Sequence, residues 1–151
     1  MDRYKIVPFG EEHIKKAAEI ERICFSEPWS ADAMKLLCGE DYPSLVALSE
    51  GGEVCGYIGS ARALDELQII NVAVSPEYRR QGVASALLSE FEGLCQRDSI
   101  ASVSLEVRVS NSAAIALYES FGYERLGLRK RFYRAPVEDA LVMGKTFSED
   151  F

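Results

Sequence analysis

The segment from Asn71 to Ala84 has the residue types and spacing of an anion-binding turn. An apolar stretch predicts a buried strand, and beyond the turn apolar residues recur at helical spacing, at Ala84, Leu87, Leu88, Phe91, Leu94 and Cys95. The turn therefore precedes a helix, where unpaired backbone N–H groups and the helix dipole favour a phosphate. Gly82 has no Cβ, so the main chain can approach an anion closely. An ordinary capped surface helix is the alternative, but the adjacent Arg79 and Arg80 favour phosphate binding.

A second segment places a carboxylate and a phenol close together along the chain. Apolar and polar residues alternate over 103–108, which predicts a half-buried strand with Glu106 on the face opposite the apolar side chains. Asn111 is a suitable cap for a helix over 112–121, and this helix contains Tyr118. Taken alone, Glu106 is a solvent-facing strand residue and Tyr118 is a core aromatic with a satisfied hydroxyl.

Together these segments resemble the GNAT acetyltransferases, in particular their RimI branch. The residues Arg79-Arg80-Gln81-Gly82-Val83-Ala84 resemble the acyl-CoA pyrophosphate loop of that family, written Q/R-x-x-G-x-G/A. The run from Leu105 to Tyr123, with Glu138-Asp139-Ala140 further on, is similar to the RimI branch. The resemblance implies acetyl transfer from acetyl-CoA to the N-terminal α-amino group of a protein, with the alanine N-terminus of a ribosomal protein as the acceptor.

The resemblance also implies roles for individual residues. Glu106 matches the base of the family and Tyr118 matches the acid, while Asn111 matches an asparagine that contacts acetyl-CoA. The backbone of the fourth strand is expected to bind the pantetheine arm where the fourth and fifth strands splay apart. The cofactor-binding residues expected on this basis are Val72, Ala73, Val74, Arg79, Arg80, Gln81, Gly82, Val83, Ala84, Ser85 and Asn111.

The two catalytic assignments agree with the proton transfers that the reaction requires. A free α-amino group has a pKa of about 7.7–8.0, so much of it is protonated near neutral pH and needs a base before it can attack. A phenol with a pKa near 10 can protonate a thiolate whose conjugate acid lies near 8.5, provided that the transfer is concerted or the site lowers the phenol's pKa.

Two other functions fit the same motifs. One is acetylation of a small-molecule amine, because fold and cofactor loop do not fix the acceptor. The other is a binding module that holds acyl-CoA or a partner without turnover, although such a module needs neither Glu106 nor Tyr118. The chain lacks the glycine-rich motifs of dinucleotide oxidoreductases and of nucleoside triphosphatases. A net charge of −7 argues against nucleic acid as a direct substrate.

Length and composition predict one ordinary globular domain over residues 1–151, located in the cytoplasm. Of the residues, 48% are hydrophobic and 27% are charged, and no apolar run approaches the roughly 20 residues of a membrane helix. The four cysteines are irregularly spaced, and we interpret them as small buried hydrophobes. With a single histidine, no metal site is expected. The sequence leaves the oligomeric state open.

The acceptor side is less well defined. Phe25 and Trp29 are expected either to line a peptide groove or to be buried between two helices, and Tyr133 matches an aromatic segment near the peptide in the family. A basic cluster is interpreted as a solvated strand face, with a ligand patch as the alternative; it comprises Arg125, Arg129, Lys130, Arg131 and Arg134.

Hydrophobic periodicity predicts the remaining elements. Strands are expected over 4–9, 44–48, 54–63, 67–74, 103–108, 123–132 and 140–145, and helices over 11–25, 30–37, 84–96 and 112–121. The apolar face of the first helix includes Glu21 at helical spacing. This order predicts an α/β (α+β) GNAT fold, with a mixed, mostly antiparallel sheet of six to seven strands flanked by about four helices.

Overall fold

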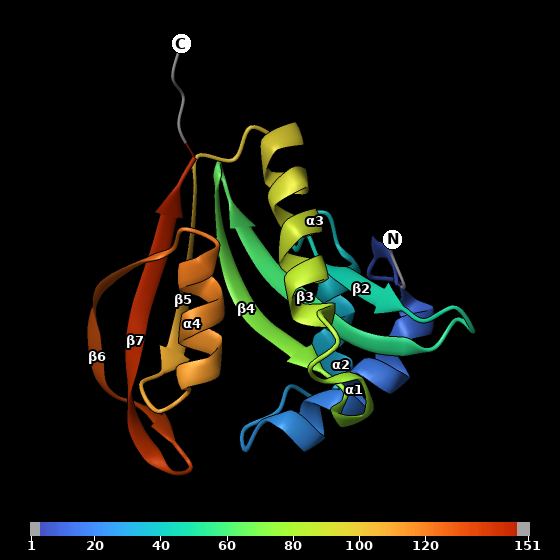
Figure 1. Cartoon of the computed structure of the whole chain (residues 1–151), viewed down its shortest axis with the longest axis horizontal. Helices are drawn as coiled ribbons and strands as arrows, with labels where there is room; N and C mark the ends of the chain where they lie inside the picture. Colours follow the sequence, from blue (N-terminus) through green and yellow to red (C-terminus); the bar gives the residue numbers. More distant parts are fainter. Residues whose placement is uncertain (1–3, 148–151) are drawn as a thin grey trace.

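A single seven-stranded sheet organises the chain in the computed structural model, which describes residues 4–147 (Figure 1). In chain order the strands are β1 (Lys5–Pro8), β2 (Leu45–Leu48), β3 (Val54–Ala63), β4 (Glu66–Val74), β5 (Ser102–Arg108), β6 (Glu124–Arg134) and β7 (Val137–Thr146). Their order across the sheet is β1-β2-β3-β4-β5-β7-β6, and every neighbouring pair is antiparallel except β4 and β5. The predicted mixed sheet is confirmed.

In the described part of the chain, four α-helices cover the sheet: α1 (Ile14–Cys24), α2 (Ala31–Met34), α3 (Val83–Arg97) and α4 (Ser112–Ser120). The caps predicted at Ser30 and Asn111 are present, because their side-chain oxygens accept the N–H groups of Ala33 at 3.1 Å and Ala114 at 3.2 Å. The first two helices are shorter than predicted. Short 3₁₀ turns occupy Glu11–His13 and Lys35–Cys38, at the start of the first predicted helix and the end of the second.

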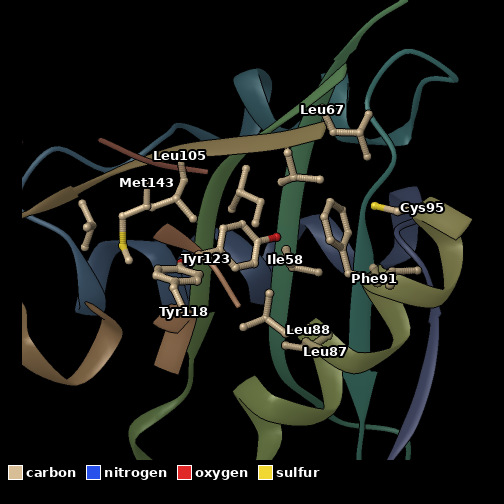
Figure 2. Packing of buried hydrophobic residues seen from close by; sticks show 14 of the residues in the cluster. Ile58, Leu67, Leu87, Leu88, Phe91, Cys95, Leu105, Tyr118, Tyr123 and Met143 are labelled. Carbon is tan, nitrogen blue, oxygen red and sulfur yellow. The ribbon is translucent and has the colours of Figure 1, made fainter. Parts of the chain in front are cut away.

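Each face of the sheet packs on its own apolar core. Leu87, Leu88 and Phe91 of α3 pack with strand residues such as Leu105 and Met143, on the face that α4 also covers (Figure 2). A second core contains Ile20 of α1, Met34 of α2 and Tyr57 of β3. Helices α3 and α4 therefore lie on the opposite face of the sheet from α1 and α2.

The parallel pair β4–β5 comes apart halfway along its length. Its register runs from Glu66↔Ser102 to Ile69↔Leu105, yet β4 continues to Val74 and β5 to Arg108 without further pairing. A bulge in β4 falls at the same place, since Ile69 pairs with Ser60 and Asn71 with Gly59, which leaves Ile70 as the extra residue. The expected splay of the fourth and fifth strands is therefore present.

The cysteine interpretation is correct for two of the four residues. Cys55 and Cys95 are buried, whereas Cys24 is half-buried and Cys38 is exposed at the end of the 3₁₀ turn. All four are free thiols. Among residues 4–147, no helix is long and apolar enough to cross a membrane.

Candidate active site

A cavity of about 660 Å³ opens where β4 and β5 diverge. Its walls come from both faces of the sheet, because the loop after α1 and strand β6 contribute on one side and α4 on the other. The lining brings together Glu106 and Tyr118, the two predicted catalytic residues. It also includes Phe25, Trp29, Asn71, Val72, Arg108, Asn111, Phe132 and Tyr133.

Glu106 lies on the α1 face of β5, opposite its buried neighbours Leu105 and Val107, as the alternation predicts. Its carboxylate accepts a hydrogen bond from Gln68 Nε2 at 2.9 Å and pairs with Arg129 at 2.7 Å. The Glu106 side chain is 16% exposed, but that of Arg129 is 57% exposed. The ion pair is thus open to solvent on the arginine side, and such a pair contributes little to stability.

Arg129 belongs to the basic cluster for which the sequence predicts a solvated strand face. The cluster does lie on exposed β6, and Arg125 pairs there with Glu119 at 2.8 Å, away from the cavity. The interpretation is incomplete for Arg129, because its guanidinium contacts the carboxylate in the cavity. The side chain therefore belongs both to the exposed strand and to the site.

Tyr118 approaches the cavity from α4 with its ring buried. The ring packs against that of Tyr123, with centroids 5.7 Å apart, beside Leu105 and Met143 (Figure 2). Within residues 4–147 its hydroxyl has no hydrogen-bond partner. Burial raises the pKa of Tyr118 above its ordinary value, so the site does not lower the pKa of the phenol. The residue therefore keeps its proton at neutral pH, as an acid must.

The anion-binding turn has the predicted backbone geometry. Gly82 is the N-cap of α3 with φ +82°, and a Cβ at this position would meet nothing within 4 Å beyond the adjoining backbone. The helix begins at Val83, and an N–H from Ala86 bonds to the Gly82 carbonyl at 3.0 Å. The N–H groups of residues 83–85 precede that bond and are available to an anion.

Two side chains of this turn, Arg79 and Gln81, form hydrogen bonds within the protein. Arg79 points back to the sheet, where its guanidinium contacts the Val74 carbonyl at 3.3 Å and Cys24 Sγ at 3.3 Å. Gln81 accepts the Tyr4 hydroxyl at 2.8 Å and donates to the protein backbone. Both side chains bond within the protein, which leaves the backbone N–H groups and Arg80 as the candidate anion-binding groups of this turn.

The expected cofactor-binding residues fall into two regions. Val72 and Asn111 line the cavity, whereas the turn 79–85 lies outside its lining, at the start of α3. The side chains of Ala73 and Val83 are buried in the two cores, at 3% and 1% exposure. Those two residues can therefore contact a ligand only through their backbone.

Sequence reasoning missed a set of contacts that closes one end of the cavity. Arg108 donates to Ser26 Oγ at 3.2 Å and to the carbonyls of Ala135 and Pro136 at 3.2 and 3.0 Å. It also pairs with Glu138 at 3.1 Å. The α1–α2 loop is thereby tied to the turn between β6 and β7.

The same two segments meet through a second carboxylate and an aromatic ring. Glu27 accepts the backbone N–H groups of Arg134 at 2.8 Å and Ala135 at 2.9 Å, and these two bonds lower the pKa of its carboxyl. The Arg108 guanidinium also lies 4.3 Å from the centroid of the Tyr133 ring. These partners lie 25 (133 − 108) to 108 positions apart in the chain, so no local signal predicts the contacts.

A buried carboxylate lies behind the cavity. Glu21 of α1 is 0% exposed and accepts hydrogen bonds from the Tyr57 hydroxyl, the Trp29 N–H at 3.0 Å and Asn71 Nδ2 at 2.9 Å. Burial raises the pKa of Glu21, and the bonds from Tyr57 and Trp29 act in the opposite direction. The sequence does give one indication of this residue, because Glu21 falls on the apolar face of its helix. A glutamate at such a position needs hydrogen-bond partners inside the protein.

Within residues 4–147, no three His, Cys, Asp or Glu side chains are grouped to hold a metal ion.

Comparisons with known proteins place this geometry among acetyltransferases. The model of the Acetyltransferase (GNAT) family matches residues 14–123. The ribosomal protein bS18-alanine N-acetyltransferase of Escherichia coli (strain K12) is 36% identical, with 87% of this chain and 90% of that protein covered. The crystal structure of the ribosomal-protein-S18-alanine N-acetyltransferase from Escherichia coli superposes with a TM-score of 0.90 at 32% identity, covering 98% and 96% of the two chains.

A more distant structure contains the acyl donor. The phosphinothricin acetyltransferase from Sinorhizobium meliloti, solved in complex with AcCoA, is 24% identical with a TM-score of 0.83, and the match covers 98% of this chain and 90% of that one. At this identity the likeness concerns the fold.

Proposed function

Because this chain belongs to the GNAT acetyltransferase family and is an acetyl-CoA-dependent N-acetyltransferase, we propose that its acceptor is the N-terminal α-amino group of a protein. The proposed acceptor is a ribosomal protein with an N-terminal alanine, modified in the cytoplasm. Its main support is the cavity at the splay, which both Glu106 and Tyr118 line, in a chain that matches RimI-type relatives over most of its length. The proposal treats residues 1–151 as one catalytic domain, since every described strand joins one sheet.

Acetyl-CoA is proposed to bind along the open edge of β4 and at the start of α3. The backbone of Val72–Val74 has no strand partner on the β5 side and can pair with the pantetheine arm. The pyrophosphate then reaches the N–H groups of residues 83–85, with Arg80 beside them and Gly82 leaving open space. The thioester would enter the cavity from this side, near Asn111.

Glu106 and Tyr118 are proposed to divide the proton transfers. Glu106 accepts a proton from the acceptor ammonium, and the neutral amine attacks the thioester carbonyl carbon. As the tetrahedral intermediate collapses, the C–S bond breaks and the CoA sulfur takes a proton from the Tyr118 hydroxyl. The raised pKa of that phenol requires this transfer to accompany C–S cleavage. The attacking nitrogen gives up its second proton, which returns through solvent to the Tyr118 phenolate, and a neutral amide remains. The exposed Arg129 can leave Glu106 for solvent when the ammonium arrives.

Peptide acetylation followed by mass spectrometry tests the acceptor. The substrate is a peptide with a free N-terminal alanine and an internal lysine, and the matched control is the same peptide with its N-terminus blocked; a panel of small amines is assayed in parallel. We expect one acetyl group, on the α-amine of the free peptide only. Acetylation confined to lysine, or to the small amines, would contradict the proposal.

A further inference from the structure

We propose that Asn71 binds the acceptor's α-amino group, and that Glu21, buried behind it, is a positioning residue that fixes the orientation of the Asn71 amide. This inference rests on the proposed function and adds two residues to the acceptor side of the site. Neither residue is among the catalytic or cofactor-binding residues that the sequence predicts, and Glu21 is completely buried.

The bulge in β4 brings Asn71 to the same face as Glu106. Leu67, Ile69 and Val72 pack in the core beneath α3 and α4, whereas Gln68 bonds to Glu106 on the other face. Strict alternation would place Asn71 with Ile69, but the extra residue Ile70 shifts it to the α1 face, where it reaches Glu21. Asn71 and Glu106 therefore line the same cavity from the two diverging strands.

The NH₂ group of the Asn71 amide is directed away from the acceptor, toward Glu21. Nδ2 donates to Glu21 Oε2 at 2.9 Å. An asparagine amide has two N–H donors and one carbonyl oxygen. Within residues 4–147, Oδ1 has no hydrogen-bond partner, so it remains as an acceptor at the cavity wall.

This oxygen suits an α-ammonium group. Such a group carries three N–H donors, and one proton passes to Glu106 before attack. A neutral oxygen can accept another N–H without competing for the proton, because an amide is not basic near neutral pH. The amine would then be held between Asn71 and Glu106, with its lone pair directed at the thioester.

Glu21 determines which end of the Asn71 amide faces the cavity. An ionised carboxylate only accepts hydrogen bonds, so the amide must turn its NH₂ group toward Glu21. The same Oε2 accepts the Trp29 N–H, so the carboxylate also holds the α1–α2 loop, which lines the cavity. Glu21 has no basic partner among residues 4–147, and the hydrogen bonds that it accepts come from neutral groups. It acts through Asn71 and Trp29 and does not touch the acceptor.

Steady-state kinetics on Asn71→Ala, Glu21→Gln and Glu21→Leu test the inference, with the alanine peptide as acceptor and acetyl-CoA affinity measured separately. Asn71→Ala should raise the KM for the peptide roughly 10- to 100-fold, the range for a hydrogen bond to a charged group, with unchanged acetyl-CoA affinity. Glu21→Gln should keep a KM near wild type, because the glutamine carbonyl can face Asn71 and Trp29 while its NH₂ faces the Tyr57 hydroxyl. Glu21→Leu should raise the KM for the peptide as much as Asn71→Ala does. The double variant that combines Glu21→Leu with Asn71→Ala should have a KM no higher than that of either single variant.

Each result supports or overturns the inference. A wild-type peptide KM in folded Asn71→Ala would remove Asn71 from acceptor binding. Equal losses in Glu21→Gln and Glu21→Leu would mean that the charge of Glu21 matters and that amide orientation does not. Where Glu21→Leu does not fold, Asn71→Ala and Glu21→Gln decide between these outcomes. Absence of α-amine acetylation by the wild-type enzyme would instead overturn the proposed function.

Discussion

Two glycines with similar positive φ angles allow the acetyl-CoA site to be tested without a confounding effect on folding. Gly82 at the start of α3 has φ +82°, and Gly52 in the turn between β2 and β3 has φ +87°. A Cβ at either position would meet nothing within 4 Å. Substitution by tryptophan should therefore destabilise both variants by a similar amount, roughly 1–2 kcal/mol for a left-handed non-glycine residue.

Only one of the two variants should lose its ligand. The indole introduced by Gly82→Trp would occupy the space through which a pyrophosphate reaches the N–H groups of residues 83–85, whereas Gly52 lies in a hairpin turn that contributes none of these groups. A hydrogen bond to a charged group contributes about 1.5–3 kcal/mol, so losing one such bond should weaken acetyl-CoA binding roughly 10- to 100-fold. Titration calorimetry gives the Kd, and urea unfolding gives the stability of each variant.

The comparison between Gly82→Trp and Gly52→Trp decides the assignment. We expect matched losses of stability and a loss of affinity in Gly82→Trp alone. Wild-type acetyl-CoA affinity in folded Gly82→Trp would refute the assignment of this turn to the pyrophosphate. Equal losses of affinity in both variants would show that strain, and not blockage, had changed binding.

Three further predictions concern the cavity walls. Tyr118→Phe should bind acetyl-CoA normally while kcat falls roughly 10²–10⁴-fold, and a wild-type kcat would exclude the hydroxyl as acid. Burial raises the pKa of Glu21, so the folded state binds this proton more tightly than the unfolded chain does, and the free energy of unfolding should fall as pH rises above about 4.5. Measured against pH, the free energy of unfolding should fall more steeply for wild type than for Glu21→Gln. Parallel pH dependences would contradict this. Arg108→Lys should raise the peptide KM without changing acetyl-CoA affinity, because one ammonium cannot replace a guanidinium that bonds both the α1–α2 loop and the β6–β7 turn; unchanged peptide kinetics would contradict that role.

Local periodicity was sufficient to predict the elements and the order in which they occur. The alternation around Glu106 placed its side chain on the correct face, and the caps at Ser30 and Asn111 followed from their side chains. The boundaries were less accurate, since 3₁₀ turns replace the ends of the first two predicted helices. The splay came from the family resemblance, and no local pattern contains it or the order of the strands across the sheet.

The missing parts of the site depend on contacts between distant segments. Arg79 was expected at a phosphate, but the end of β4 and Cys24 offer its guanidinium nearer partners. The Arg108 contacts and the bulge at Ile70 both depend on how strands are paired, which periodicity alone does not give. Glu21 could have been noticed, because a glutamate on an apolar helix face requires partners inside the protein.

The central claim is that the carboxylate in this cavity removes a proton from the α-amine, and one substitution tests it most directly. Glu106→Gln keeps the shape of the side chain, and Glu119→Gln removes a comparable ion-paired carboxylate outside the cavity. At neutral pH, with subsaturating alanine peptide and bound acetyl-CoA, the rate of α-amine acetylation should fall roughly 10²–10⁴-fold in Glu106→Gln and stay unchanged in Glu119→Gln. Near-wild-type turnover by Glu106→Gln under these conditions would contradict the claim.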